Sequence, residues 1–101
     1  MIFRRPYADA IRRQLDLFQR ENRELLERAT IALRTYGEAP RDEAEERYGD
    51  YADLLDLAAA LLAELRDGFA ETVADPDGYR RAFDRAAARR FPELAEALKE
   101  T

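Results

Sequence analysis

The chain has 101 residues, of which 47% are apolar or aromatic and 39% are charged, and its formal net charge is −5. A chain of this length forms one domain. Because it contains neither Cys nor His, disulfides, thiolate or imidazole metal sites, a Cys nucleophile and a Ser-His-Asp triad are all excluded.

Alanine and leucine dominate the apolar residues, Val73 is the only valine, and the four Gly and four Pro leave few turns. This composition is typical of helices. We therefore expect a single all-α domain over residues 1–101. The basic residues are arginines apart from Lys99, and this excess of Arg and Ala is typical of a GC-rich bacterial genome.

No membrane or export segment is apparent in the sequence. The longest stretch without a charged residue is 57–63, far short of the roughly 20 residues that span a bilayer. The N-terminus has no apolar segment ahead of a small-residue cleavage site. We expect a cytoplasmic protein with no membrane contact.

The first helix is predicted over about residues 6–36. Apolar or small residues recur there at alternating spacings of four and three. Pro6 suits the first helical turn, and Gly37 is expected to end the helix in the left-handed conformation. The stripe consists of Ile11, Leu15, Phe18, Asn22, Leu25, Ala29, Ala32 and Tyr36.

The second helix is predicted over about residues 41–74, because Pro40 and several acidic residues mark its start. Its apolar stripe has the same spacing, and Gly49 and Gly68 are the places where a bend is expected. The stripe consists of Ala44, Tyr48, Tyr51, Leu55, Ala58, Leu62, Leu65, Phe69 and Thr72 or Val73.

Two shorter helices are predicted after a turn at 75–78. The third runs over about residues 78–91 and ends at Phe91-Pro92, since Pro disfavours helix at the residue before it. A short C-terminal helix follows over about residues 92–100.

The five-residue connection at 37–41 makes the two long helices an antiparallel hairpin, in which residue numbers that sum to about 77 lie at one level. This places Tyr48 beside Ala29. The third helix is too short to cover the whole hairpin, so the half near the connection is expected to stay uncovered.

Apolar residues flank the stripes in that half, and their surplus predicts a homodimer with a four-helix core. Asn22 is either buried at this interface, where it would fix the register, or lies at a helix edge or kink facing solvent. The predicted interface residues are Asn22, Leu25, Leu26, Leu33, Tyr36, Tyr48, Tyr51, Leu54 and Leu55.

Charge is uneven along the chain. Residues 1–36 carry eight arginines against five acidic residues, residues 37–77 carry three against thirteen, and residues 78–101 carry six basic against four acidic residues. An acidic segment between two basic ones predicts that the middle helix packs on both neighbours.

Paired carboxylates form the one candidate catalytic pattern. Glu24 and Glu27 on the first helix, and Asp50 and Asp53 on the second, are predicted at matching levels, where four acids would hold Mg²⁺. The spacing resembles the ExxE and ExxD pattern of all-α nucleoside triphosphate pyrophosphohydrolases of the MazG type, with Asp50 in place of the usual Glu. The resemblance implies a Mg²⁺-dependent nucleotide hydrolase.

A basic cluster is the second candidate. Arginines alternate with aromatics near the start of the first helix, and the arginines of the third helix are expected at the same end of the molecule. Such a cluster would bind nucleic acid or an anionic surface, although the net charge of −5 argues against nucleic acid. Its first-helix members are Arg4, Arg5, Arg12 and Arg13.

The interpretation that best fits these features is a non-catalytic helical-bundle protein. We expect it to act through protein–protein contacts, as an adaptor or regulatory subunit, without a cofactor. The nucleotide hydrolase and the arginine-mediated binder of anions are the alternatives.

Overall fold

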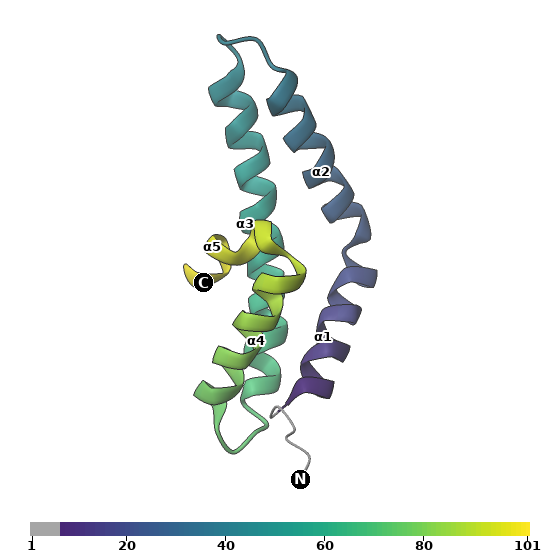
Figure 1. Cartoon of the computed structure of the whole chain (residues 1–101), viewed down its shortest axis with the longest axis vertical. Helices are drawn as coiled ribbons and strands as arrows, with labels where there is room; N and C mark the ends of the chain where they lie inside the picture. Colours follow the sequence, from purple (N-terminus) through teal and green to yellow (C-terminus); the bar gives the residue numbers. More distant parts are fainter. Residues whose placement is uncertain (1–6) are drawn as a thin grey trace.

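The computed structural model describes residues 7–101, which form an all-α fold without strands, as the sequence predicts (Figure 1). The molecule is elongated, with extents of 57 × 23 × 22 Å. No helix within residues 7–101 combines the length and apolar character that crossing a bilayer requires. The elements are α1 (Ala8–Glu21), α2 (Arg23–Glu38), α3 (Ala44–Ala70), α4 (Pro76–Arg90), the 3₁₀ helix η1 (Pro92–Leu94) and α5 (Ala95–Lys99).

The first predicted helix is divided at Asn22, so the prediction of one continuous helix over residues 6–36 is wrong. Asn22 has φ −116° and ψ 26°, which departs from helical geometry. Its side-chain amide and its backbone N–H both donate to the carbonyl of Phe18 at 3.0 Å. A side chain bonded to the backbone four residues earlier competes with the helical hydrogen bonds and bends the helix. The structure therefore favours the kink interpretation, with Asn22 half-buried.

α3 is shorter than the predicted helix over 41–74. Residues 41–43 form a turn in which the N–H of Glu43 donates to the carbonyl of Pro40 at 2.9 Å. Pro40 therefore starts a turn and not the helix. At the other end, Thr72 and Val73 already belong to the connection to α4.

The glycines within the helices do not act as predicted. Gly37 lies inside α2 and does not adopt the left-handed conformation, so the expected helix end at Gly37 is wrong. Gly49 and Gly68 lie inside α3 and do not interrupt it. The packing of the two long helices outweighs the weak helix propensity of these residues.

The register of the α2–α3 hairpin also differs from the prediction. The helix ends that face each other are Glu38 and Ala44, whose numbers sum to 82 and not to about 77. Tyr48 consequently packs against Tyr36, with ring centroids 5.2 Å apart, and not at the level of Ala29. The predicted connection lies two residues too early, because the prediction ends the helix at Gly37, whereas α2 continues to Glu38.

The segment 75–78, predicted as a turn, is the cap and first turn of α4. The Asp75 carboxylate accepts a hydrogen bond from the N–H of Gly78 at 3.0 Å, which satisfies one of the free donors at the helix start. Pro76 occupies the first helical position, where its missing N–H costs nothing. The same residue types that favour a turn thus begin a helix here.

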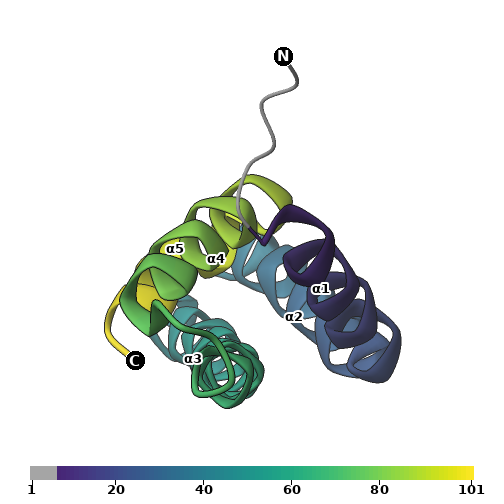
Figure 2. The ribbon, with the colours of Figure 1, turned by 90° about the horizontal axis from the view of Figure 1, so that it is seen from below.

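α3 packs on both its neighbours, as the charge pattern predicts, and contacts α1, α2 and α4. Seen along the long axis, α1, α3 and α4 occupy three corners of a bundle (Figure 2). The core lies at the end of the molecule that carries α4. Its largest fully buried side chains are Phe18, Leu62, Tyr79, Phe83 and Leu94.

The C-terminal segment folds back on this core. α4 ends at Arg90, before Phe91 and Pro92, which confirms the predicted end. Phe91 is buried and meets Phe18 of α1 edge to face. Leu98 of α5 is buried as well, and α5 packs on α3 and α4.

Arg66 of α3 is the only buried charged side chain in residues 7–101, with 6% of its surface exposed. Its guanidinium donates to Asp67 at 2.9 Å and to Asp84 of α4 at 3.1 Å. Asp67 also accepts from Arg80 at 3.0 Å. A buried charge needs such partners, so these four side chains serve to join α3 to α4.

Candidate functional site

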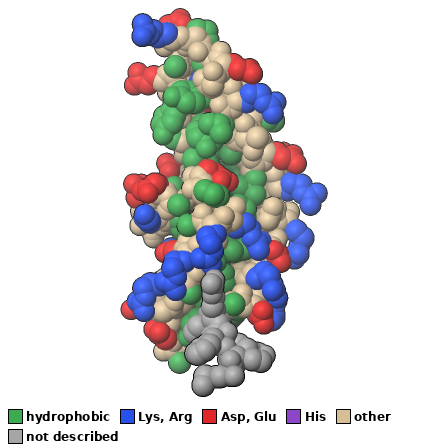
Figure 3. Space-filling model, in the orientation of Figure 1, with side chains coloured by type: hydrophobic (Ala, Val, Ile, Leu, Met, Phe, Trp, Pro, Cys, Tyr) green, Lys and Arg blue, Asp and Glu red, His purple; other side chains and the backbone are tan. Residues whose placement is uncertain are grey.

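The half of the hairpin near the connection is uncovered, as predicted. Within residues 7–101, α2 contacts only α1 and α3, whereas α4, η1 and α5 cover the other half of α3. Leu33 and Tyr48 therefore keep 46% and 52% of their surface exposed. Figure 3 shows hydrophobic side chains gathered on this upper half of the molecule. We call the following residues the hairpin face: Leu33, Tyr36, Tyr48 and Tyr51.

Three tyrosines form the centre of the hairpin face. Tyr48 packs edge to face on Tyr36 and on Tyr51, with centroid separations of 5.2 Å and 6.4 Å. Burial raises the pKa of Tyr51 above its ordinary value, and the nearby carboxylate of Glu93 adds to the effect. Because Glu93 belongs to η1, the covered half begins directly beside Tyr51.

The remaining predicted interface residues lie elsewhere. Leu25, Leu26 and Leu55 are half-buried against the core. Leu54 lines a shallow hollow of about 260 Å³ together with Ile31, which is 57% exposed. Ile31 and Leu33 lie on opposite sides of α2, since each residue turns the helix by about 100°. Ile31 lies off the apolar stripe, so the spacing of apolar residues does not mark it.

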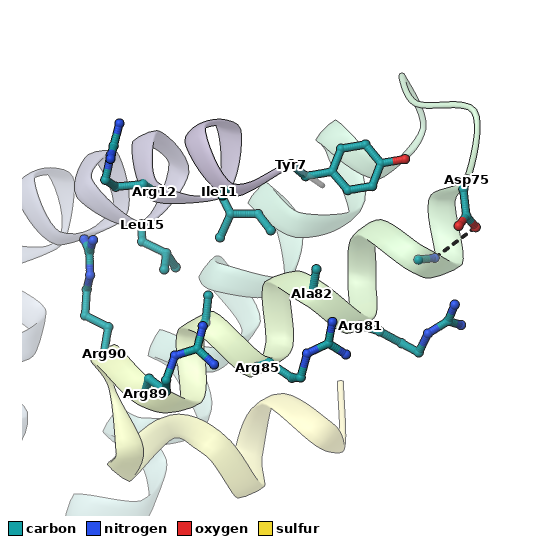
Figure 4. A pocket seen from close by; sticks show the side chains of 13 residues that line it. Tyr7, Ile11, Arg12, Leu15, Asp75, Arg81, Ala82, Arg85, Arg89 and Arg90 are labelled. Carbon is teal, nitrogen blue, oxygen red and sulfur yellow. Dashed lines mark hydrogen bonds between the residues drawn. The ribbon is translucent and has the colours of Figure 1, made fainter. Parts of the chain in front are cut away.

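An open groove of about 890 Å³ runs between α1 and α4 (Figure 4). Ile11 and Leu15 point from α1 toward α4, and Tyr7 lies at one end of the groove. Arginines edge this apolar floor on both sides. We call it the arginine groove, and its basic residues are Arg12, Arg81, Arg85, Arg89 and Arg90.

The arginines of this groove differ in their pairing. Arg12 donates to Asp9 at 3.2 Å, and Arg90 of α4 pairs with Asp16 of α1. No ion pair in residues 7–101 involves the other three, and all three are exposed. The unpaired positive charges are those of Arg81, Arg85 and Arg89.

The described residues bring part of the predicted basic cluster together. Arg12 does lie beside the arginines of α4, as expected. Arg13 is exposed and does not line the groove, and Arg4 and Arg5 lie outside the described residues. The sequence predicts that arginines of the two helices lie at one end of the molecule. It does not predict which side of each helix faces the other helix.

The carboxylates predicted at matching levels do not converge. All four are exposed, and in residues 7–101 no three acidic side chains lie close enough to hold a metal ion. The corrected register separates the two pairs by about five residues, roughly 7 Å along the hairpin. The pairs are Glu24 with Glu27 and Asp50 with Asp53.

Comparison of the chain with protein-family models, with curated protein sequences and with solved structures found no match. The surface features of the molecule that bear on its function are therefore the hairpin face and the arginine groove.

Proposed function

We propose that this protein is non-catalytic and acts through protein contacts, as an adaptor or regulatory subunit that forms a homodimer through the hairpin face. The observation that supports it best is the half-exposed state of Leu33 and Tyr48 at the end of the hairpin that α4 does not reach. Apolar side chains gathered on one face mark protein interaction sites. A cytoplasmic location, expected from the sequence, belongs to the same proposal.

The hairpin face suits a second copy of the chain. Tyrosines supply a large apolar contact with a polar tip, which is the side-chain type enriched at the centre of interfaces. A twofold axis would set Tyr36 and Tyr48 of one copy against the hairpin face of the other. The two α2 and two α3 helices would then form the four-helix core expected from the sequence.

The position of α4 and η1 favours an antiparallel pair. Both elements pack on the half of α3 that is remote from the tip of the hairpin, and Glu93 of η1 borders Tyr51 on the hairpin face. In a parallel pair the α4 helices of the two copies would meet and hold the hairpin faces apart. An antiparallel pair lets the hairpin faces meet and leaves the two α4 helices at opposite ends.

Light scattering coupled to size-exclusion chromatography tests the dimer. We expect a particle of twice the 11.7 kDa chain mass at micromolar concentration, and single-chain mass for Leu33→Glu and Tyr48→Glu. Ile31→Glu is the matched control, since Ile31 is as exposed but lies on the other side of α2. A single-chain particle for the unmodified protein at about 100 µM would refute the proposal.

The orientation is tested separately, because the chain has no Cys and one label site can be introduced by Arg41→Cys. Arg41 lies at the tip of the hairpin, between α2 and α3. Spin labels at this site should be far apart in an antiparallel dimer. A short distance between the two labels would mean a parallel pair and contradict the arrangement.

A further inference from the structure

We propose that the arginine groove is a second binding site, which holds an acidic amphipathic helix of a partner protein. The groove lies between α1 and α4, at the opposite end of the molecule from the tip of the hairpin. It shares no residue with the hairpin face. The proposal therefore stands independently of the homodimer.

The floor of the groove suits the apolar side of a helix. Ile11 and Leu15 are buried, and Ala82 and Ala86 of α4 are half-buried and small. Small side chains allow a partner helix to approach the backbone of α4 closely. The lining extends along α4 from Gly78 to Arg90, about 18 Å, which matches a helix of some 12–15 residues.

The charges of the groove suit the acidic side of the same helix. Arg81, Arg85 and Arg89 follow each other at four-residue spacing and form a row along α4. Carboxylates at every fourth position of a partner helix repeat with the same rise of about 6 Å. None of the three has a carboxylate partner in residues 7–101, so their positive charge is free for a ligand.

The same features favour a protein helix over a nucleic acid. Residues 37–77 carry thirteen acidic residues against three arginines, and this negative charge would repel an extended polyanion. Among residues 7–101 the groove floor is mainly aliphatic, and Tyr7 is the one aromatic side chain that lines it, whereas single-stranded nucleic acids need aromatic surfaces for stacking. A short amphipathic helix uses both the apolar floor and the arginine row.

The test uses a labelled synthetic peptide of about 15 residues, with Leu along one face and Glu at four-residue spacing beside it. We expect binding by fluorescence anisotropy at micromolar peptide, and at least tenfold weaker binding to the double variant Arg85→Glu, Arg89→Glu. Arg13→Glu is the matched control, because Arg13 is exposed on α1 outside the groove. Circular dichroism establishes that each variant is folded.

Charge reversal provides the second measurement. A peptide with Lys in place of Glu should bind the double variant and not the unmodified protein. Three outcomes would overturn the proposal: equal binding of a scrambled peptide of the same composition, equal binding of the glutamate peptide by the double variant, or tight binding of an oligonucleotide where the peptide does not bind.

Discussion

Phe18 of α1 meets Phe91, the residue that ends α4, edge to face with ring centroids 5.5 Å apart. This contact joins the N-terminal helix to the C-terminal segment. Both rings are buried, so Phe91→Ala leaves a cavity and should lower the free energy of unfolding by about 3–4 kcal/mol. Chemical denaturation measures the loss, and amide hydrogen exchange should quicken in residues 94–98.

Leu57→Ala is the control for that substitution. Leu57 is 51% exposed, so its truncation should change stability by less than about 0.5 kcal/mol. A Phe91→Ala variant as stable as Leu57→Ala would mean that the C-terminal segment does not depend on this contact.

Tyr79 carries a buried hydroxyl with no hydrogen-bond partner in residues 7–101, in a ring cluster with Tyr7, Phe69 and Phe83. Burying an unpaired hydroxyl is unfavourable. Tyr79→Phe keeps the ring contacts and should raise the free energy of unfolding by about 1 kcal/mol. A loss of stability in thermal or urea unfolding would mean that the hydroxyl is hydrogen-bonded after all.

The same residue makes stability fall at alkaline pH. Burial raises the pKa of Tyr79 from 10.0 to about 12. The unfolded chain therefore releases the proton first, and this contribution to stability, complete below pH 10, is lost as the pH rises toward 12. Between pH 9 and 12, the free energy of unfolding measured by urea titration should fall less for Tyr79→Phe than for the unmodified protein.

Asp67 has the opposite pH dependence. The hydrogen bond from Arg66 lowers the pKa of Asp67 below 3.8, and a second bond from Arg80 adds to it. The folded state holds the charged carboxylate, so its contribution is present above pH 3.8 and is lost as the pH falls through the lowered pKa. Because Asp67 is 44% exposed, the effect should stay below about 1 kcal/mol. In Asp67→Asn this contribution to the pH dependence of stability should be absent when unfolding is measured at acid pH.

The glycines of α3 offer a gain in stability. A Cβ at Gly49 or Gly68 would meet nothing within 4 Å, and both lie inside a helix. Ala at either position should stabilise the protein by about 1 kcal/mol in thermal unfolding. Gly78→Ala is the contrasting variant, because its Cβ would collide with the Asp75 carboxylate that caps α4. That variant should lose about 1 kcal/mol.

The fold was largely predictable because the periodicity of apolar residues is a local signal. Residues such as Ile11, Leu15 and Phe18 recur at helical spacing and are buried in the structure. A kink at Asn22 was one of two alternatives that the sequence left open. The apolar stripe continues through Asn22 and could not decide between them, because the bend depends on one side-chain hydrogen bond to Phe18. The predicted register of the hairpin was wrong because the packing of α2 on α3 keeps Gly37 helical, so that α2 ends later than predicted.

The sequence predicts the hairpin face better than it predicts the arginine groove. The hairpin face followed from a comparison of helix lengths, which requires no knowledge of side-chain directions. The arginine groove required the relative rotation of α1 and α4, and that rotation is set by contacts between distant residues such as Arg90 and Asp16. Arg12 could be proposed from the sequence, whereas its partners across the groove could not be distinguished from Arg80, which faces Asp67.

Within residues 7–101, α2 contacts only α1 and α3, and this divides the molecule into a well-anchored and a weakly anchored half. Opening the tip of the hairpin breaks a single helix–helix interface, whereas releasing α4 breaks contacts with α1, α3 and α5. Local unfolding should therefore start at the tip, where few buried contacts oppose it. Any molecule that binds there also determines how long that half stays folded, so affinity and local lifetime would change together.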